Sequence, residues 1–71
     1  MEKLIKIGVM PGRISELAVA VGTPIADVIA MADLDPKGYD VKVDGTVVTD
    51  LSTPVTDNTN LILLVVQVKG N

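Results

Sequence analysis

The sequence predicts an α+β fold in which a mixed sheet of four or five strands packs on one helix. Short alternations of apolar and polar residues, which are typical of strands, occur near the N-terminus and over residues 39–43. A stretch with helical periodicity follows a Thr-Pro pair, and residues 61–66 are apolar at every position. The expected order of elements is ββαβ(β)β, within a single domain over residues 1–71.

An antiparallel hairpin is expected at the start of the chain. Ile5, Ile7 and Val9 alternate with Lys6 and a glycine, which is typical of a half-buried strand. The sequence Met-Pro-Gly-Arg at residues 10–13 predicts a turn, and a second alternation follows it over residues 15–21. Two neighbouring strands joined by a short turn are the simplest interpretation.

A helix is expected to begin at Thr23 and Pro24. The threonine hydroxyl would cap the helix, and proline suits the first helical position because that position needs no N–H. Apolar residues then follow at i, i+3, i+4 and i+7, on one face: Ile25, Val28, Ile29 and Ala32. Pro36 would end the helix within about three turns.

The second half of the chain predicts another hairpin and a central strand. Residues 39–43 alternate, and Asp44-Gly45 is a strong two-residue turn signal before the short strand 46–48. Val55 is expected to make an isolated core contact. The run 61–66 is apolar on both faces, which favours a strand that is flanked on both sides inside the sheet. This arrangement is a β-grasp.

Several turn segments resemble those of a known family. Residues 38–45 (Gly-Tyr-Asp-Val-Lys-Val-Asp-Gly), Thr53-Pro54-Val55 and the final aliphatic strand together resemble the ubiquitin-like sulfur carriers of thiamine and molybdopterin biosynthesis (ThiS/MoaD type). Gly22-Thr23 before the helix also fits this pattern. The resemblance covers nearly the whole chain and implies the ubiquitin-like β-grasp fold.

The resemblance also implies a candidate carrier site in the C-terminal tail. In that family, a terminal Gly-Gly is adenylated by an E1-like partner enzyme and converted to a thiocarboxylate. Here the motif maps only onto Gly70, because Lys69 precedes it and Asn71 follows it. Carrier chemistry at Gly70 would therefore require the removal of Asn71.

A second candidate site is the face of the sheet that the helix leaves free. Only one of the two apolar sets in residues 61–66 can meet the helix, and Ile62, Leu64 and Val66 are expected on the free face. Contiguous apolar patches on small proteins are usually covered or functional. We therefore expect a protein partner or a second copy of the chain to bind there.

The composition argues against several other classes of function. The chain has no cysteine and no histidine, so it lacks the usual zinc ligands and the usual catalytic base, and an enzyme is not expected. A net charge of -3 without a basic patch disfavours nucleic acid, and no apolar stretch is long enough to span a membrane. A cytoplasmic protein without a cofactor or metal is expected.

These observations lead to two functional hypotheses. The first is a non-catalytic interaction module that binds another protein, or itself, through the free face of the sheet. The alternative is a sulfur carrier or protein modifier that acts through Gly70 with an adenylating enzyme. The first is preferred because Lys69 interrupts the Gly-Gly motif.

Overall fold

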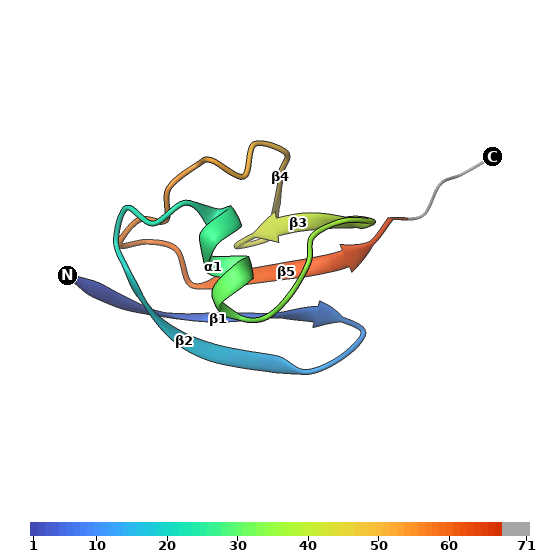
Figure 1. The fold of residues 1–71 in the computed structure, drawn as a ribbon, viewed down its shortest axis with the longest axis horizontal. Coiled ribbons are helices and arrows are strands. Elements are labelled where there is room, and N and C mark those ends of the chain that lie inside the picture. Colours follow the sequence, from blue (N-terminus) through green and yellow to red (C-terminus); the bar gives the residue numbers. More distant parts are fainter. Residues whose placement is uncertain (68–71) are drawn as a thin grey trace.

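Five strands form one mixed sheet, and a single helix covers one face of it (Figure 1). The computed structural model describes residues 1–67. The elements along the chain are β1 (Glu2–Met10), β2 (Ile14–Ala20), α1 (Ile25–Met31), β3 (Tyr39–Val43), β4 (Thr46–Val48) and β5 (Leu61–Val66). Across the sheet the order is β2-β1-β5-β3-β4, with β1 and β5 parallel and the other neighbours antiparallel. The predicted fold class, the element order and the central position of the last strand are confirmed.

β1 and β2 form the predicted N-terminal hairpin, and Gly8 allows them to approach closely. Gly8 pairs with Ile14. A Cβ atom at Gly8 would lie 2.2 Å from the carbonyl oxygen of Arg13 and 2.8 Å from the Cα of Ile14. Both neighbours are backbone atoms, so a larger residue fits only if the hairpin shifts.

A two-residue turn joins β3 and β4. Asp44 and Gly45 have φ values of 50° and 88°, as this type of hairpin turn requires. The Asp44 carboxylate accepts hydrogen bonds from the backbone N–H groups of Asn60 at 3.2 Å and Leu61 at 3.0 Å. The turn is thereby tied to the first residue of β5, and the predicted Asp-Gly hairpin is confirmed.

Backbone groups of a distant loop satisfy the N-terminus of α1. The N-cap residue is Pro24, in an extended conformation, and no side chain caps the helix. The N–H of Ile25 donates to the carbonyl oxygen of Thr53 at 3.0 Å, and the N–H of Ala26 donates to that of Leu51 at 2.9 Å. The first N–H groups of a helix lack partners within the helix, so these loop carbonyls take the place of a side-chain cap.

The prediction that Thr23 caps the helix is therefore wrong. Its hydroxyl instead donates to the carbonyl oxygen of Ala20 at 2.7 Å, where β2 ends. The predicted apolar stripe is confirmed, because Ile25, Val28 and Ile29 are all buried. No helix within residues 1–67 combines the length and apolar character needed to cross a membrane.

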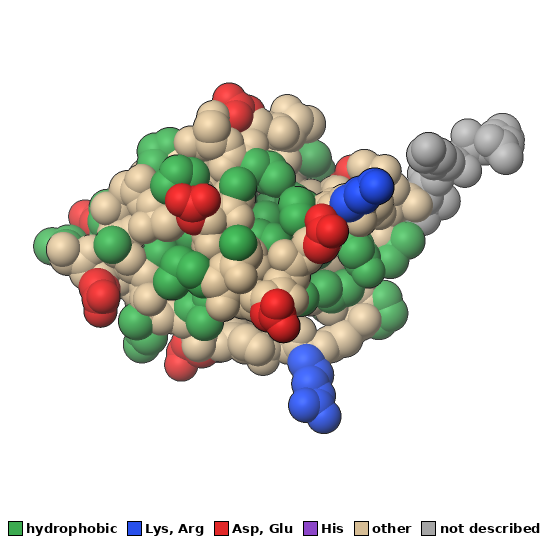
Figure 2. Space-filling view, viewed as in Figure 1, with side chains coloured by type: hydrophobic (Ala, Val, Ile, Leu, Met, Phe, Trp, Pro, Cys, Tyr) green, Lys and Arg blue, Asp and Glu red, His purple; other side chains and the backbone are tan. Residues whose placement is uncertain are grey.

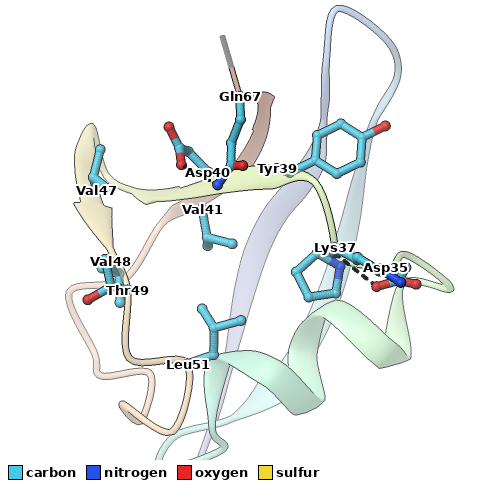
Figure 3. A pocket seen from close by; sticks show the side chains of 11 residues that line it. Asp35, Lys37, Tyr39, Asp40, Val41, Val47, Val48, Thr49, Leu51 and Gln67 are labelled. Atoms are coloured by element: carbon cyan, nitrogen blue, oxygen red, sulfur yellow. Dashed lines mark hydrogen bonds between the residues drawn. The ribbon is translucent and has the colours of Figure 1, made fainter. Parts of the chain in front are cut away.

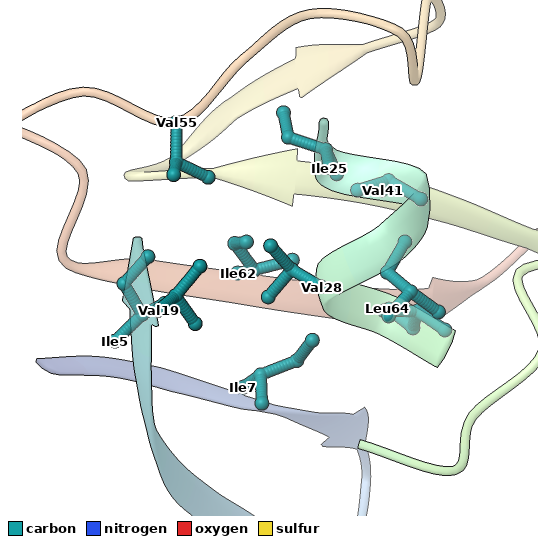
Figure 4. Close-up of a cluster of buried hydrophobic side chains, with 10 residues drawn as sticks. Ile5, Ile7, Val19, Ile25, Val28, Val41, Val55, Ile62 and Leu64 are labelled. Carbon is teal, nitrogen blue, oxygen red and sulfur yellow. The ribbon is translucent and has the colours of Figure 1, made fainter. Parts of the chain in front are cut away.

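The core lies between α1 and the sheet, and it is entirely aliphatic (Figure 4). Its buried members are Ile5, Ile7, Val19, Ile25, Val28, Ile29, Val41, Val55, Ile62 and Leu64. Val55 comes from an irregular segment, and its N–H donates to the carbonyl oxygen of Thr23 at 2.9 Å. Its carbonyl oxygen accepts from the N–H of Gly22, also at 2.9 Å. The predicted core position of Val55 is confirmed.

Ile62 and Leu64 face the helix, which corrects the prediction that they lie on the free face of the sheet. Both side chains are 0% exposed. Ile62 pairs with Ile7 of β1, and Leu64 pairs with Val41 of β3, so each has core residues as neighbours. Because side chains alternate along a strand, the free face receives the other set. That set is Leu61, Leu63 and Val65.

Candidate protein-interaction site

The free face of the sheet carries an apolar strip along its centre. Leu61, Leu63 and Val65 of β5 project onto this face and are half-buried. We call these three residues the β5 strip. Strands β1 and β3 flank it on either side, so the strip occupies the middle of the sheet. The opposite side of β5 packs in the core through Ile62 and Leu64.

Exposed apolar side chains continue the β5 strip toward both edges of the sheet. Leu4 of β1 is 61% exposed, Ile14 of β2 is 49% exposed and Val47 of β4 is 50% exposed. One row of paired positions crosses all five strands: Ile14, Gly8, Leu63, Lys42 and Val47. Side chains in such a row share one face. Its apolar members are Ile14, Leu63 and Val47, and Lys42 lies between the last two. Exposed apolar surface of this kind marks interaction sites on small soluble proteins.

Two lysines and one aspartate flank the β5 strip. Lys6 pairs with Leu61 from β1, and Lys42 pairs with Leu63 from β3. Glu16 pairs with Lys6 from the edge strand β2. The long apolar stems of lysine can lie along neighbouring leucines while the ammonium groups stay in water. Asp40 pairs with Val65 from β3, so the centre of the free face is apolar with flanks of mixed charge.

The helix-covered side of the molecule has a different charge pattern. Figure 2 shows acidic side chains spread over this side. Asp27 lies in α1, Asp33 and Asp35 follow that helix, and Asp50 and Asp57 lie in the long connection between β4 and β5. Most of the net charge of -3 therefore belongs to loops and to the helix side, while the β5 strip has both lysines and Asp40 beside it.

A pocket of about 410 Å³ lies where the segment before β3 meets β3, β4 and the segment after β4 (Figure 3). Its apolar lining includes Pro36, Val41 and Leu51, and the last two point toward one another across the hollow. Asp40 and Gln67 lie at the rim, where the Gln67 amide donates to the Asp40 carboxylate at 3.1 Å. The pocket can accept an apolar side chain. Its lining holds no cysteine or histidine, so it offers neither of these nucleophiles.

The carboxylate of Asp50 lies next in sequence to the pocket residue Leu51. It accepts hydrogen bonds from the hydroxyl of Ser52 and from the backbone N–H of Ser52, the latter at 3.0 Å. These bonds favour the charged carboxylate and hold the pKa of Asp50 below its ordinary value of 3.8. No group of three His, Cys, Asp or Glu side chains that could hold a metal ion occurs within residues 1–67.

The structure brings only part of the predicted site residues to the surface. Ile62 and Leu64 belong to the core. Val66, at the end of β5, is 51% exposed but lies on the same side of the sheet as these two residues, so its predicted place on the free face is also wrong. The predicted carrier residues lie outside the described residues: Lys69, Gly70 and Asn71. Sequence reasoning missed the β5 strip because all six residues of β5 are apolar, so β5 by itself gives no sign of which set faces out.

Comparison with known proteins supports the fold. No protein-family model matches the sequence, and no curated protein matches it. Among solved structures, the chain is similar to a ubiquitin of Caldiarchaeum subterraneum, with a TM-score of 0.65 and 23% identity over 100% of both chains. A likeness at this identity is a likeness of fold, so the resemblance to ThiS/MoaD-type sulfur carriers stays a prediction. The chain has a ubiquitin-like β-grasp fold.

Proposed function

We propose that this protein is a non-catalytic interaction module that binds a protein partner through the β5 strip. The observation that supports this proposal is the row of half-buried and exposed apolar side chains across the free face. A domain this small gains stability from every apolar side chain that it buries, yet here aliphatic residues are left at the surface. Contact with another protein would remove them from water.

The charges beside the β5 strip indicate the chemistry of the partner. Lys6 and Lys42 lie one strand away from Leu61 and Leu63. A partner that places carboxylates around an apolar contact would pair with both ammonium groups while it covers the leucines. Such complementary charges select the partner and speed association more than they add affinity. We therefore propose an apolar partner surface that places carboxylates opposite Lys6 and Lys42 but not opposite Asp40, which pairs with Val65.

Site-specific photocrosslinking in the native host tests this function. A photoreactive amino acid at position 63 should capture one protein in preference to others, and the same amino acid at the exposed helix position 30 should not. The captured protein, once purified, should bind the unmodified chain. Leu63→Asp should weaken that binding by about tenfold or more, because truncation or charging of a central contact residue commonly has effects of this size.

Charge variants complete this test. Lys42→Glu should weaken binding, and the loss should be larger at low ionic strength because salt screens exposed charges. Ala30→Asp is the matched control on the helix and should leave binding unchanged. Equal capture from positions 63 and 30, or full binding by Leu63→Asp, would contradict the proposal.

A second candidate function is that of a sulfur carrier or protein modifier acting through Gly70. The similarity of fold to an archaeal ubiquitin supports this class, and Gly70 follows the central strand by four residues. Lys69 makes it the lesser candidate, because a side chain there would hinder an extended tail in a narrow enzyme channel.

The intact mass of the protein from its native host distinguishes the two candidate functions. Loss of Asn71 with one oxygen replaced by sulfur would support the sulfur carrier. A full-length, unmodified chain under sulfur demand would oppose it.

A further inference from the structure

We propose that two copies of this chain pair through β2, antiparallel and about a two-fold axis at Leu17, so that their sheets join into one. This inference concerns the edge of the sheet and goes beyond the proposed function, which concerns its free face. β2 is the outermost strand on one side of the sheet. Its free edge is the surface that we assign to the second copy.

The hydrogen-bond pattern decides which groups of β2 point outward. The N–H of Val21 donates to the carbonyl oxygen of Met1 at 2.9 Å, so these two residues form a hydrogen-bonded pair. Such pairs alternate with non-bonded pairs in an antiparallel ladder. The odd-numbered residues of β2 therefore bond to β1, and the even-numbered residues turn their N–H and C=O groups outward. These outward residues are Ile14, Glu16, Ala18 and Ala20.

Within residues 1–67, the last of these outward positions is the one whose outward backbone group has a partner. The carbonyl oxygen of Ala20 accepts from the N–H of Thr23 at 3.1 Å and from its hydroxyl at 2.7 Å. Within residues 1–67, no backbone hydrogen bond outside the β1–β2 ladder involves Glu16 or Ala18. The middle of the edge is thus open, while its C-terminal end is closed.

β2 has few of the features that usually prevent edge strands from pairing. It is seven residues long, contains neither proline nor lysine, and has one charged residue, Glu16. Its central outward residue, Ala18, is uncharged. The opposite edge strand, β4, has only three residues, so it offers little to pair with. Long edges with little charge and without proline or cover are templates for another strand.

One antiparallel register suits a second copy better than its neighbours. With the axis at Leu17, Glu16 of each copy faces Ala18 of the other, and two pairs of backbone hydrogen bonds form. A shift that centres the axis on Glu16 would place the Glu16 carboxylates of the two copies directly opposite each other, which is unfavourable. A shift to Ala18 would need the carbonyl oxygen of Ala20, which Thr23 already occupies.

The side chains around the axis fit this register. Leu17 is half-buried and packs against the core at the open edge of the sheet. In the dimer, the two Leu17 side chains would be directly opposite, in a non-bonded pair with close side chains. Each would cover the exposed part of the other and extend the two cores toward each other.

Sedimentation of the full chain from micromolar to millimolar concentration tests the proposal. We expect a reversible monomer–dimer equilibrium, with hydrogen exchange at the amides of Glu16 and Ala18 slowing as concentration rises. The amides of Leu17 and Val19 bond to β1 in both states, so their protection should change little. Ala18→Pro removes an outward N–H without a loss of any β1 bond and should abolish the dimer, whereas Ala18→Ser should keep it.

Two charge variants test the register and cover the case in which Ala18→Pro does not fold. Glu16 of the second copy lies opposite position 18, so Ala18→Lys should tighten the dimer and Ala18→Asp should loosen it. Leu63→Asp, on the free face, should leave dimerisation unchanged. A chain that stays monomeric at millimolar concentration, a dimer that survives Ala18→Pro, or equal effects of Ala18→Lys and Ala18→Asp would each overturn the proposal.

Discussion

At Gly8 of β1, the space that a side chain would need is filled by the backbone of the hairpin partner. A Cβ atom would lie 2.2 Å from the Arg13 carbonyl oxygen. We therefore predict that Gly8→Ala lowers the free energy of unfolding by about 1–3 kcal/mol, the usual range for overpacking. Urea denaturation measures the change. Ala18→Val, which adds volume at an exposed position of β2, should stay within about 0.5 kcal/mol; equal losses in both variants would contradict the steric explanation.

The carboxylate of Asp50 supplies a prediction about pH. Its pKa is lowered by the hydrogen bond from the Ser52 hydroxyl first and by that from the Ser52 N–H second. A lowered pKa means that the folded state binds fewer protons than the unfolded state. The contribution to stability is therefore present above the ordinary value of 3.8 and is lost as pH falls through the lower, folded pKa.

Ser52→Ala removes the larger of these two hydrogen bonds. We expect the pKa of Asp50 to rise toward 3.8 in this variant, because only the backbone N–H still stabilises the charge. A carboxyl-carbon NMR titration of Asp50 measures the shift. Ser52→Thr keeps the hydroxyl and should keep the low pKa. An unchanged titration midpoint in Ser52→Ala would assign the shift to the backbone alone.

At the scale of single elements, β5 has one set of side chains in the core and one set at the surface. Leu64 is 0% exposed, whereas Leu63 is half-buried on the free face. We predict that Leu64→Ala lowers the free energy of unfolding by about 2–5 kcal/mol, as large-to-small changes in a core do. Leu63→Ala, its neighbour in the same strand, should have a clearly smaller effect in the same denaturation experiment. The reverse order would place the β5 strip in the core.

The helix α1 shows why local signals predicted its position but not its cap. Apolar residues at helical spacing fixed the face that packs on the sheet, and Ile25, Val28 and Ile29 are buried as predicted. The cap depended on whether the segment around Leu51 and Thr53 would come close enough to accept its N–H groups. That contact is remote in sequence, so no motif near residue 23 reports it.

For the whole molecule, Val55 shows how an irregular segment completes the core. It is 1% exposed although it lies in no strand or helix. We predict that Val55→Ala lowers the free energy of unfolding by about 2 kcal/mol, from the burial lost with its methyl groups. Val47→Ala, at a 50% exposed position of β4, is the matched control and should cost about 0.5 kcal/mol or less. Equal effects would mean that the segment 49–60 does not contribute to a common core.

The two surfaces proposed for binding also belong to the scale of the whole molecule. The β5 strip exists because β1 and β3 flank β5 on both sides and expose one side of the sheet. The free edge of β2 exists because this strand is last in the sheet. The order of strands thus creates both surfaces, and variants at Leu63 and Ala18 can test them separately.

The sequence by itself determined the class of fold, the order of the elements, the Asp44-Gly45 hairpin and the apolar stripe of α1. These depend on residues near one another in the chain, through periodicity and turn chemistry. Tertiary structure alone decided that Ile62 and Leu64 belong to the core and Leu61, Leu63 and Val65 to the surface. β5 is apolar throughout, so a shift of one residue in its pairing would exchange the two sets. The register with β1 and β3, formed between residues far apart in the chain, fixes which set meets the helix.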